Sequence, residues 1–244
     1  MSPASNEVFL RVLPALQKAG AAAFPIAPGV ADLLTTTNRN WSTFARVLIE
    51  MTPPTPPDEV ASLVQSARAT DAATRVLALA RLARSKRPEA IGALRDAARV
   101  YHDTVQRVTG TVALGYTGDV LPEIAATALA GNLRDRERVV RSSAADSLGR
   151  MCAALQTRVP ATPAMIVGGF ATDFLQTRDD PQGAVIVLGC LPLQVAARAR
   201  GPLQALVDDP KVADFNKISA RVLLARLQAV DQDAAGAIAV PKQP

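Results

Sequence analysis

The stretch Arg141-Ser-Ser-Ala-Ala-Asp-Ser-Leu-Gly149 decides the fold, because its skeleton occurs five times along the chain. The skeleton has a basic residue at position zero, a small residue at plus three, Leu at plus seven and Gly or Ala at plus eight. The copies are Arg75/Ala78/Leu82/Ala83, Arg107/Gly110/Leu114/Gly115, Arg141/Ala144/Leu148/Gly149, Pro181/Ala184/Leu188/Gly189 and Lys217/Ala220/Leu224/Ala225, where Pro181 replaces the base. Successive copies begin 32, 34, 40 and 36 residues apart, which is typical of a repeat architecture.

Each copy of the skeleton predicts one face of a helix. Positions plus three and plus seven are four residues apart, so they lie on the same side of an α-helix. A small residue one turn before a Leu lets a neighbouring helix approach while the Leu fills the groove. We therefore expect the five leucines to occupy equivalent buried positions in successive repeats.

Composition favours an all-α protein with an aliphatic core. Of the 244 residues, 49% are hydrophobic and only 4% are aromatic. Ala, Leu and Val predominate without alternating β-branched runs, which favours helices over strands. No apolar run reaches the roughly 18 residues of a membrane span, and the first residues do not resemble a signal peptide. A secretory chain trimmed of its leader would look the same.

The two cysteines, Cys152 and Cys190, occur far apart in Ala- and Leu-rich surroundings. Neither is part of a Cys-x-x-Cys motif. We interpret them as two buried free thiols, which favours a reducing, cytoplasmic location.

The positive charge is concentrated in the middle of the chain. Residues 61–160 carry fifteen bases and nine acids, whereas the flanking segments are nearly balanced. The densest clusters are Arg81, Arg84, Lys86 and Arg87, and then Arg134, Arg136, Arg138 and Arg141. Such clusters can attract phosphates, but acids are interleaved with the second one. We interpret both as solvated helix faces.

Four segments are expected along the chain. Residues 1–51 form an atypical N-terminal helical cap, beginning with a helix capped by Ser5, in which Trp41 and Phe44 close the end of the stack. The run Thr52-Pro-Pro-Thr-Pro-Pro57 is a stiff connector. Residues 58–230 contain the repeated helix pairs, and residues 231–244 form a mobile tail.

Helix pairs of this length and period resemble HEAT repeats, including the bacterial HEAT-like variety found in phycobilin lyases. The likeness is carried by Asp103-Thr-Val-Gln-Arg107…Ala113-Leu-Gly115 and Glu137-Arg-Val-Val-Arg141…Ser147-Leu-Gly149. The resemblance implies a right-handed α-solenoid over about residues 58–230. Tetratricopeptide and ankyrin repeats expect aromatic or Thr-Pro-Leu-His signatures that this chain lacks.

HEAT proteins often have an acid that opens the first helix of a pair and a base four residues later. This pattern applies to Asp71 with Arg75, Asp103 with Arg107, and Glu137 with Arg141. The acid favours the helix N-terminus, and the spacing gives a favourable pair. We predict a structural ladder between adjacent repeats, with a phosphate-binding strip as the alternative. Pro181 and Ala213 limit the ladder to the middle repeats.

The sequence shows no catalytic or metal-binding constellation. His102 is the single histidine, and we expect it to be a surface or capping residue, so a zinc site or a Ser-His-Asp triad has few candidates. The acidic pairs Asp179/Asp180 and Asp208/Asp209 are explained best as helix caps. We expect no cofactor.

Three functions remain open. The first is a non-enzymatic scaffold whose solenoid face binds a helix or extended tail of another protein. The second is a nucleic-acid binder resembling the HEAT-like alkylpurine DNA glycosylases, although specific binding is not expected because stacking aromatics are scarce. The third is an enzyme or chaperone resembling the phycobilin lyases.

Overall fold

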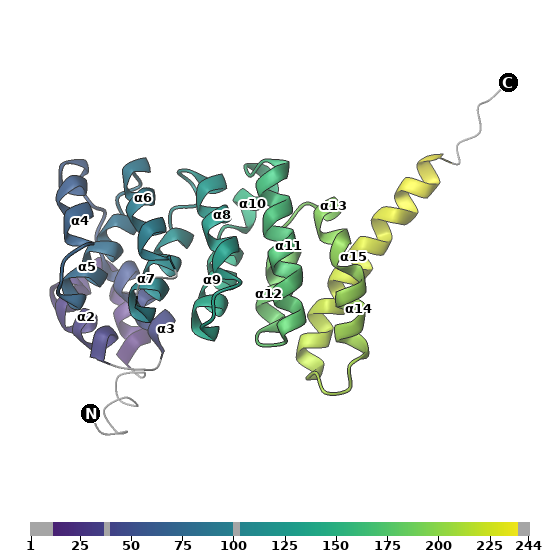
Figure 1. The fold of residues 1–244 in the computed structure, drawn as a ribbon, viewed down its shortest axis with the longest axis horizontal. Coiled ribbons are helices and arrows are strands. Elements are labelled where there is room, and N and C mark those ends of the chain that lie inside the picture. The colour runs from purple at the N-terminus through teal and green to yellow at the C-terminus, as the bar shows by residue number, and fades with distance from the viewer. Residues whose placement is uncertain (1–11, 37–39, 100–102, 239–244) are drawn as a thin grey trace.

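The computed structural model describes residues 12–36, 40–99 and 103–238. Throughout these residues the secondary structure is helical, and the helices stack side by side into an elongated all-α solenoid (Figure 1). The predicted fold class is therefore confirmed. Ser5 and His102, for which capping and surface roles are predicted, lie outside the described residues.

Two rows of helices build the stack. The row of first helices, which carry the repeated skeleton, contains α5 (Ala72–Ala83), α7 (Thr104–Gly115), α9 (Arg138–Arg150), α12 (Pro181–Gly189) and α15 (Asp214–Ile238). The row of second helices contains α4 (Val60–Ser66), α6 (Pro88–Ala97), α8 (Pro122–Asn132), α11 (Ala161–Thr177) and α14 (Arg200–Asp208). Shorter elements join them: η2 (Pro57–Glu59), α10 (Cys152–Thr157), α13 (Leu193–Ala196) and η3 (Ala197–Ala199).

Local sequence explains where these helices begin. Asp71, Asp103 and Asp180 are N-caps, and each carboxylate accepts a hydrogen bond from the backbone N–H of the third residue of its helix. Pro88, Pro122 and Pro181 occupy the first turn of their helices, where no intrahelical N–H is required. The first helix of the third repeat, α9, ends at Arg150, and after Met151 the short helix α10 begins at Cys152.

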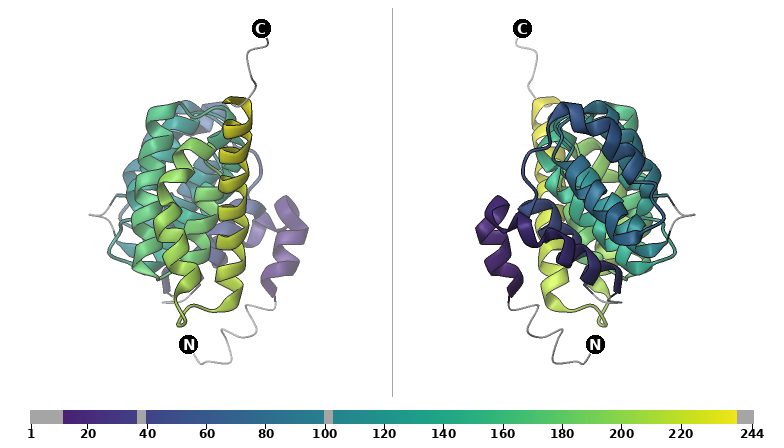
Figure 2. Two further views of the ribbon diagram at one scale, coloured as in Figure 1. Left: turned by 90° about the vertical axis from the view of Figure 1, so that its right-hand side faces the viewer. Right: turned by 90° about the vertical axis from the view of Figure 1, so that its left-hand side faces the viewer.

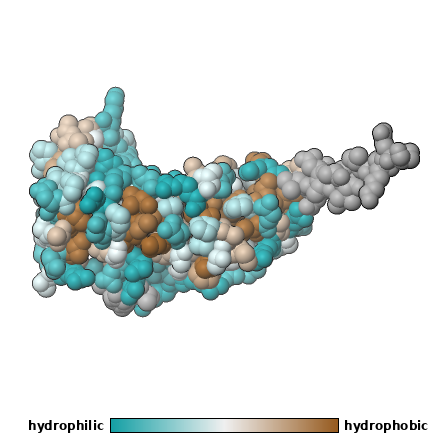
Figure 3. Space-filling model, turned by 90° about the horizontal axis from the view of Figure 1, so that it is seen from above, coloured by the Kyte–Doolittle hydropathy of each residue, from teal (hydrophilic) through white to brown (hydrophobic). Residues whose placement is uncertain are grey.

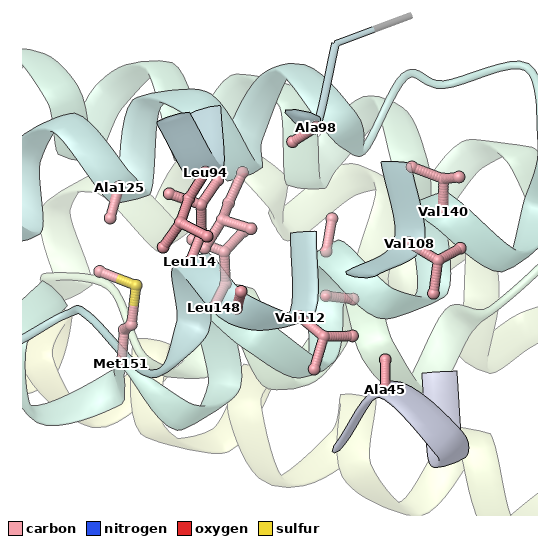
Figure 4. Packing of buried hydrophobic residues seen from close by; sticks show 14 of the residues in the cluster. Ala45, Leu94, Ala98, Val108, Val112, Leu114, Ala125, Val140, Leu148 and Met151 are labelled. Atoms are coloured by element: carbon pink, nitrogen blue, oxygen red, sulfur yellow. The ribbon is translucent and has the colours of Figure 1, made fainter. Parts of the chain in front are cut away.

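The leucines of the repeated skeleton form the centre of the core. Leu82, Leu114, Leu148 and Leu188 are fully buried, and Leu224 in the last repeat is partly buried. Figure 4 shows Leu94 of α6 together with Leu114 and Leu148 in one cluster between the helix rows. The predicted register is therefore confirmed in the first four copies, whereas in α15 the fully buried leucines are Leu223 and Leu227.

The small residue at plus three also has the expected role. A Cβ atom added to Gly110 would lie 2.8 Å from the backbone nitrogen of Ala98, at the end of α6. We expect Gly110→Ala to lower the free energy of unfolding by about 1–3 kcal/mol, as overpacking does. Chemical denaturation measures this change.

Gly92 in α6 is the matched control, because nothing lies within 4 Å of its added Cβ. Gly92→Ala should be neutral or stabilising by about 0.5–1 kcal/mol, since alanine loses less backbone entropy in a helix. Equal effects of the two substitutions would contradict the close approach at Gly110.

The N-terminal cap lies against the first helices. A helix that ends at Ala19 is followed by η1 (Gly20–Ile26), α2 (Ala27–Thr36) and α3 (Trp41–Met51). Helix α2 packs against α5, and α3 packs across α7 with further contacts to α5 and α9. In Figure 2 these purple helices lie beside the stack rather than in line with it. The cap therefore covers the first helices of the first two repeats.

The proline-rich connector is held against α5. The Thr55 hydroxyl donates to the Arg81 carbonyl at 2.7 Å, and its N–H donates to the Arg84 carbonyl at 3.3 Å. The Arg84 Nε donates in turn to the Thr52 carbonyl at 3.2 Å. These hydrogen bonds satisfy polar groups of a segment whose prolines prevent it from forming a helix.

The expectation of two free thiols is wrong. Cys152 and Cys190 form a disulfide, with their Cα atoms 4.8 Å apart. Cys152 begins α10 and Cys190 follows the last residue of α12. Their separation of 38 residues is close to the 40-residue spacing of the third and fourth repeats. Residues one repeat apart lie side by side in a solenoid, so the bond joins neighbouring repeats.

The last helix is longer than expected. We predict from sequence that it ends at Val230, but α15 continues to Ile238, and only residues 239–244 of the predicted tail lie outside the described residues. Among those described, no helix is both long and apolar enough to cross a membrane.

Candidate functional site: the open face of the first helices

The predicted ladder residues lie at the junctions between repeats. Arg75 donates from Nη1 to the carbonyls of Ala69 and Thr70, which precede its own helix, at 3.0 and 2.7 Å. Its Nη2 donates to Asp103 of the next repeat at 3.1 Å. The other carboxylate oxygen of Asp103 accepts from Gln106 N–H at 2.8 Å. One acid therefore caps its helix and bonds the preceding repeat.

Asp71, the first acid of the predicted ladder, has a local role. Hydrogen bonds from Thr74 hold the pKa of the Asp71 carboxyl below its usual range, and the charge of Arg75 adds to this effect. The carboxylate caps α5 at 2.7 Å from Thr74 N–H. Asp71 thus stabilises the start of the helix.

The second junction is buried. Arg107 Nη1 lies 3.3 Å from Asp135 Oδ2, and the two side chains are 0% and 3% exposed. The sequence pattern pairs Arg107 with Asp103 and Arg141 with Glu137. In the structure Asp103 bonds Arg75, Glu137 lies 3.8 Å from Arg136, and Asp135 is the acid beside Arg107. Asp135 also accepts from Glu137 N–H at 2.8 Å. The turn before α9 places Asp135, and not the Glu137 N-cap of that helix, next to Arg107.

The ladder also extends beyond the middle repeats, contrary to the sequence-based prediction. Arg141 pairs with Asp179, and Arg178 lies 2.5 Å from Asp209. Arg178 at the end of α11 replaces the base that is lost at Pro181. Of the predicted caps, Asp180 does cap α12, at 2.8 Å from Gly183 N–H, but Asp179 and Asp209 connect repeats.

The basic clusters are largely engaged in internal contacts. Arg81 pairs with Glu59, Lys86 with Asp119 at 2.9 Å, and Arg134 with Asp173. The Arg134 guanidinium also lies 3.8 Å from the centre of the Phe170 ring. Figure 3 shows hydrophobic patches separated by hydrophilic residues on the face seen from above. These contacts support the interpretation of the clusters as paired, solvated faces.

One side of the first helices is buried at the start of the stack and becomes exposed towards its end. Positions plus one and plus five lie on the side of α5 and α7 that faces the cap, and on the equivalent side of the later first helices. They are the buried Val76 and Ala80 in α5, the buried Val108 and Val112 in α7, then Ser142 and Asp146 in α9, Gln182 and Ile186 in α12, and Ile218 and Val222 in α15. Figure 4 shows Ala45 of α3 next to Val112.

Beyond α7 these positions open to solvent. Ile186, Ile218 and Val222 are 43%, 55% and 57% exposed. We name the surface formed by Asp146, Ile186, Ile218 and Val222 the open face. Large aliphatic side chains at equivalent positions of two adjacent helices form a patch rather than isolated exposed residues.

A cluster of polar residues lies where α3 ends and the open face begins. The Tyr116 hydroxyl donates to Glu50 Oε1 at 2.5 Å, and Gln17 Nε2 donates to Glu50 Oε2 at 2.7 Å. Arg150 of α9 lies 4.0 Å from Glu50 and 5.1 Å from the centre of the Tyr116 ring. These contacts attach the cap to the third repeat.

Two groups in this region have shifted pKa values. Burial, together with the hydrogen bond to Glu50, raises the pKa of Tyr116. Partial burial of its carboxyl group raises the pKa of Asp146, and the charge of Asp180 adds to the rise against the opposing charges of Arg150 and Arg46. Asp146 therefore favours folding most at acid pH, and this contribution is lost as the pH rises through its folded-state pKa.

A hollow lies on the other side of the solenoid, on the row of second helices. It has a volume of about 450 Å³ and lies between α6, α8 and the start of α11, with Ala98, Ile124, Ala128 and Pro163 in its wall. Residues 100–102, which follow this wall, lie outside the described residues. Within those that are described, His, Cys, Asp and Glu side chains do not form a group of three that could hold a metal ion.

Comparisons with known proteins agree with the fold and give no function. No family model matches the chain, and no curated protein matches it. One similar solved structure is the crystal structure of an engineered protein from the Northeast Structural Genomics Consortium. It has a TM-score of 0.53 and 14% sequence identity, over 90% of this chain and 96% of the other. The chain thus belongs to the class of all-α solenoids.

Proposed function

We propose that the protein is a non-enzymatic scaffold of HEAT-type repeats that binds another protein on its open face. The observation that carries this proposal is the change at positions plus one and plus five. They are buried beside the protein's own cap in the first two repeats, whereas in the last two they carry the exposed aliphatic side chains of Ile186, Ile218 and Val222. A stacked row of helices with an uncovered apolar patch is well suited to holding a partner.

The other two functions have less support. The clustered bases are engaged with acids of the same chain, so specific binding of nucleic acid is not expected. No described feature favours a tetrapyrrole site or a catalytic step, and we expect no cofactor. The Cys152–Cys190 disulfide supports an oxidising compartment in place of the cytoplasmic location expected from two free thiols.

The proposal predicts that charges on the open face abolish partner binding. The purified protein and an Ile186→Asp/Val222→Asp variant are used as baits, and the captured proteins are compared by quantitative mass spectrometry. We expect at least one protein to be captured reproducibly by the wild type and to be reduced at least tenfold with the variant, because a carboxylate would be desolvated in the interface.

Met165→Asp is the matched control, since Met165 is similarly exposed on α11 in the other row. It should capture the partner as the wild type does. Equal capture by the double variant would contradict the assignment of this face. Recovery of nucleic acid that survives physiological salt would contradict the proposed class of partner.

A further inference from the structure

We propose that the partner segment on the open face is an acidic amphipathic α-helix, which lies along α15 as α3 lies along α7. This inference rests on the proposed function and specifies the chemistry of its partner. It is carried by the apolar stripe of α15, by the arrangement of α3 in the same chain, and by the charges that border the stripe.

Helix α15 has two apolar sides. Ala220, Leu223 and Leu227 are buried against the preceding helices. On the opposite side Phe215, Ile218, Val222, Ala225 and Ala229 are exposed, and Phe215 is 62% exposed. At 100° per residue these five positions fall within an arc of about 80°. Their spacing of three and four residues is that of a seam between two packed helices.

The exposed stripe continues onto the neighbouring helix. Helix α12 packs against α15, and its Ile186 is exposed at the position equivalent to Val222. Ile186 rests on α9, because a Cβ added to Gly149 would lie 3.1 Å from its Cγ2 atom. The stripe from Phe215 to Ala229 is about 21 Å long, which corresponds to about four turns of a bound helix.

The same chain shows that this side of a first helix accepts another helix. In the second repeat, the equivalent Val108 and Val112 are buried, and α3 packs on α7 through buried residues such as Phe44, Ala45 and Leu48. Positions plus one and plus five are thus helix-binding positions where an occupant is present. In α15 they carry Ile218 and Val222, which are as apolar as the valines of α7.

Charge decides between a second copy and a different protein. Arg221 and Arg226 are exposed and lie on the two borders of the stripe, and Asp214, which is also exposed, lies beside Arg221 on one of them, so the borders have a net positive charge. An antiparallel pair of α15 helices packed about Val222 would bring Arg221 of both copies together, which is unfavourable. A helix with Glu or Asp beside its apolar stripe would instead form favourable pairs on both borders.

A pair of designed peptides tests this inference. Both are fluorescent 21-residue amphipathic helices with Leu at the seam positions; one has Glu at the flanking positions and the other has Lys. Fluorescence anisotropy with the full chain should show a Kd at least tenfold lower for the Glu peptide. Ile218→Asp should abolish its binding, and Arg221→Glu/Arg226→Glu should reverse the preference between the peptides.

Arg136→Glu is the control, because its side chain is 72% exposed on the turn before α9, and it should leave the preference unchanged. The inference is overturned if the Glu peptide does not bind or binds Ile218→Asp equally. Self-association that Ile218→Asp abolishes would identify a second copy instead, and sedimentation with phosphatidylserine vesicles would identify a membrane surface. Failure of the peptides while partner capture still depends on Ile186 would overturn the acidic helix and leave the scaffold function standing.

Discussion

Replacing Arg107 by Gln is expected to lower the free energy of unfolding by about 3–5 kcal/mol, the usual effect of breaking a buried ion pair. The guanidinium is fully buried beside the Asp135 carboxylate, so its loss leaves a buried negative charge without its counter-charge. Thermal and urea denaturation of the purified variant measure the change. Adding Asp135→Asn should restore part of the loss, because the remaining buried group is then neutral.

Arg75→Gln is the matched control for this prediction. It removes the equivalent pair one repeat earlier, but Asp103 is 51% exposed there, and exposed pairs contribute under about 1 kcal/mol. The two substitutions should therefore differ several-fold in their effect. Similar Tm values for both variants would show that burial at the Arg107 junction does not govern its contribution. If Arg107→Gln abolished partner binding without changing stability, the ladder residues would belong to a binding site and would not serve mainly to hold repeats together.

Removing the disulfide with Cys152→Ser/Cys190→Ser is expected to lower the free energy of unfolding by about 3–4 kcal/mol. The bond closes a loop of 38 residues, and the loss of chain entropy in the unfolded state scales with the logarithm of the loop length. Denaturation of the variant and the wild type, each with and without dithiothreitol, measures the effect.

The reductant provides the control for this second prediction. It should destabilise the wild type by a similar amount and leave the double variant unchanged. Thiol titration of the unfolded wild type should find no free thiol before reduction. Two reactive thiols in the untreated protein would contradict the disulfide and support two free cysteines instead.

The solenoid could be predicted from sequence because its signal is periodic. A Leu at plus seven and a small residue at plus three recur in every copy, and the Leu is fully buried in the first four. The match between Leu148 and the equivalent leucines depends only on helical geometry and spacing. Such patterns are local, so a single chain contains all the information required.

The candidate site was harder to predict because its contacts cross repeats. The sequence pattern pairs Arg107 with Asp103 at the start of its own helix, whereas the structure places Asp135 of the next repeat beside it, because the shape of the turn decides which carboxylate is close. The disulfide had a visible signal, as a spacing close to one repeat places two cysteines side by side. The open face could not be predicted, because only the position of α3 shows which first helices are covered.

The position of α3 has a mechanical consequence. It contacts α5, α7 and the edge of α9, and Glu50 near its end contacts Tyr116 and Arg150. Helix α3 therefore links three repeats. Within the described residues, no helix crosses the first helices of the later repeats in this way, and those repeats are joined by ion pairs and the disulfide. We therefore expect the half of the solenoid that carries the open face to bend more easily than the half that α3 covers. A bound helix would brace that half as α3 braces the first.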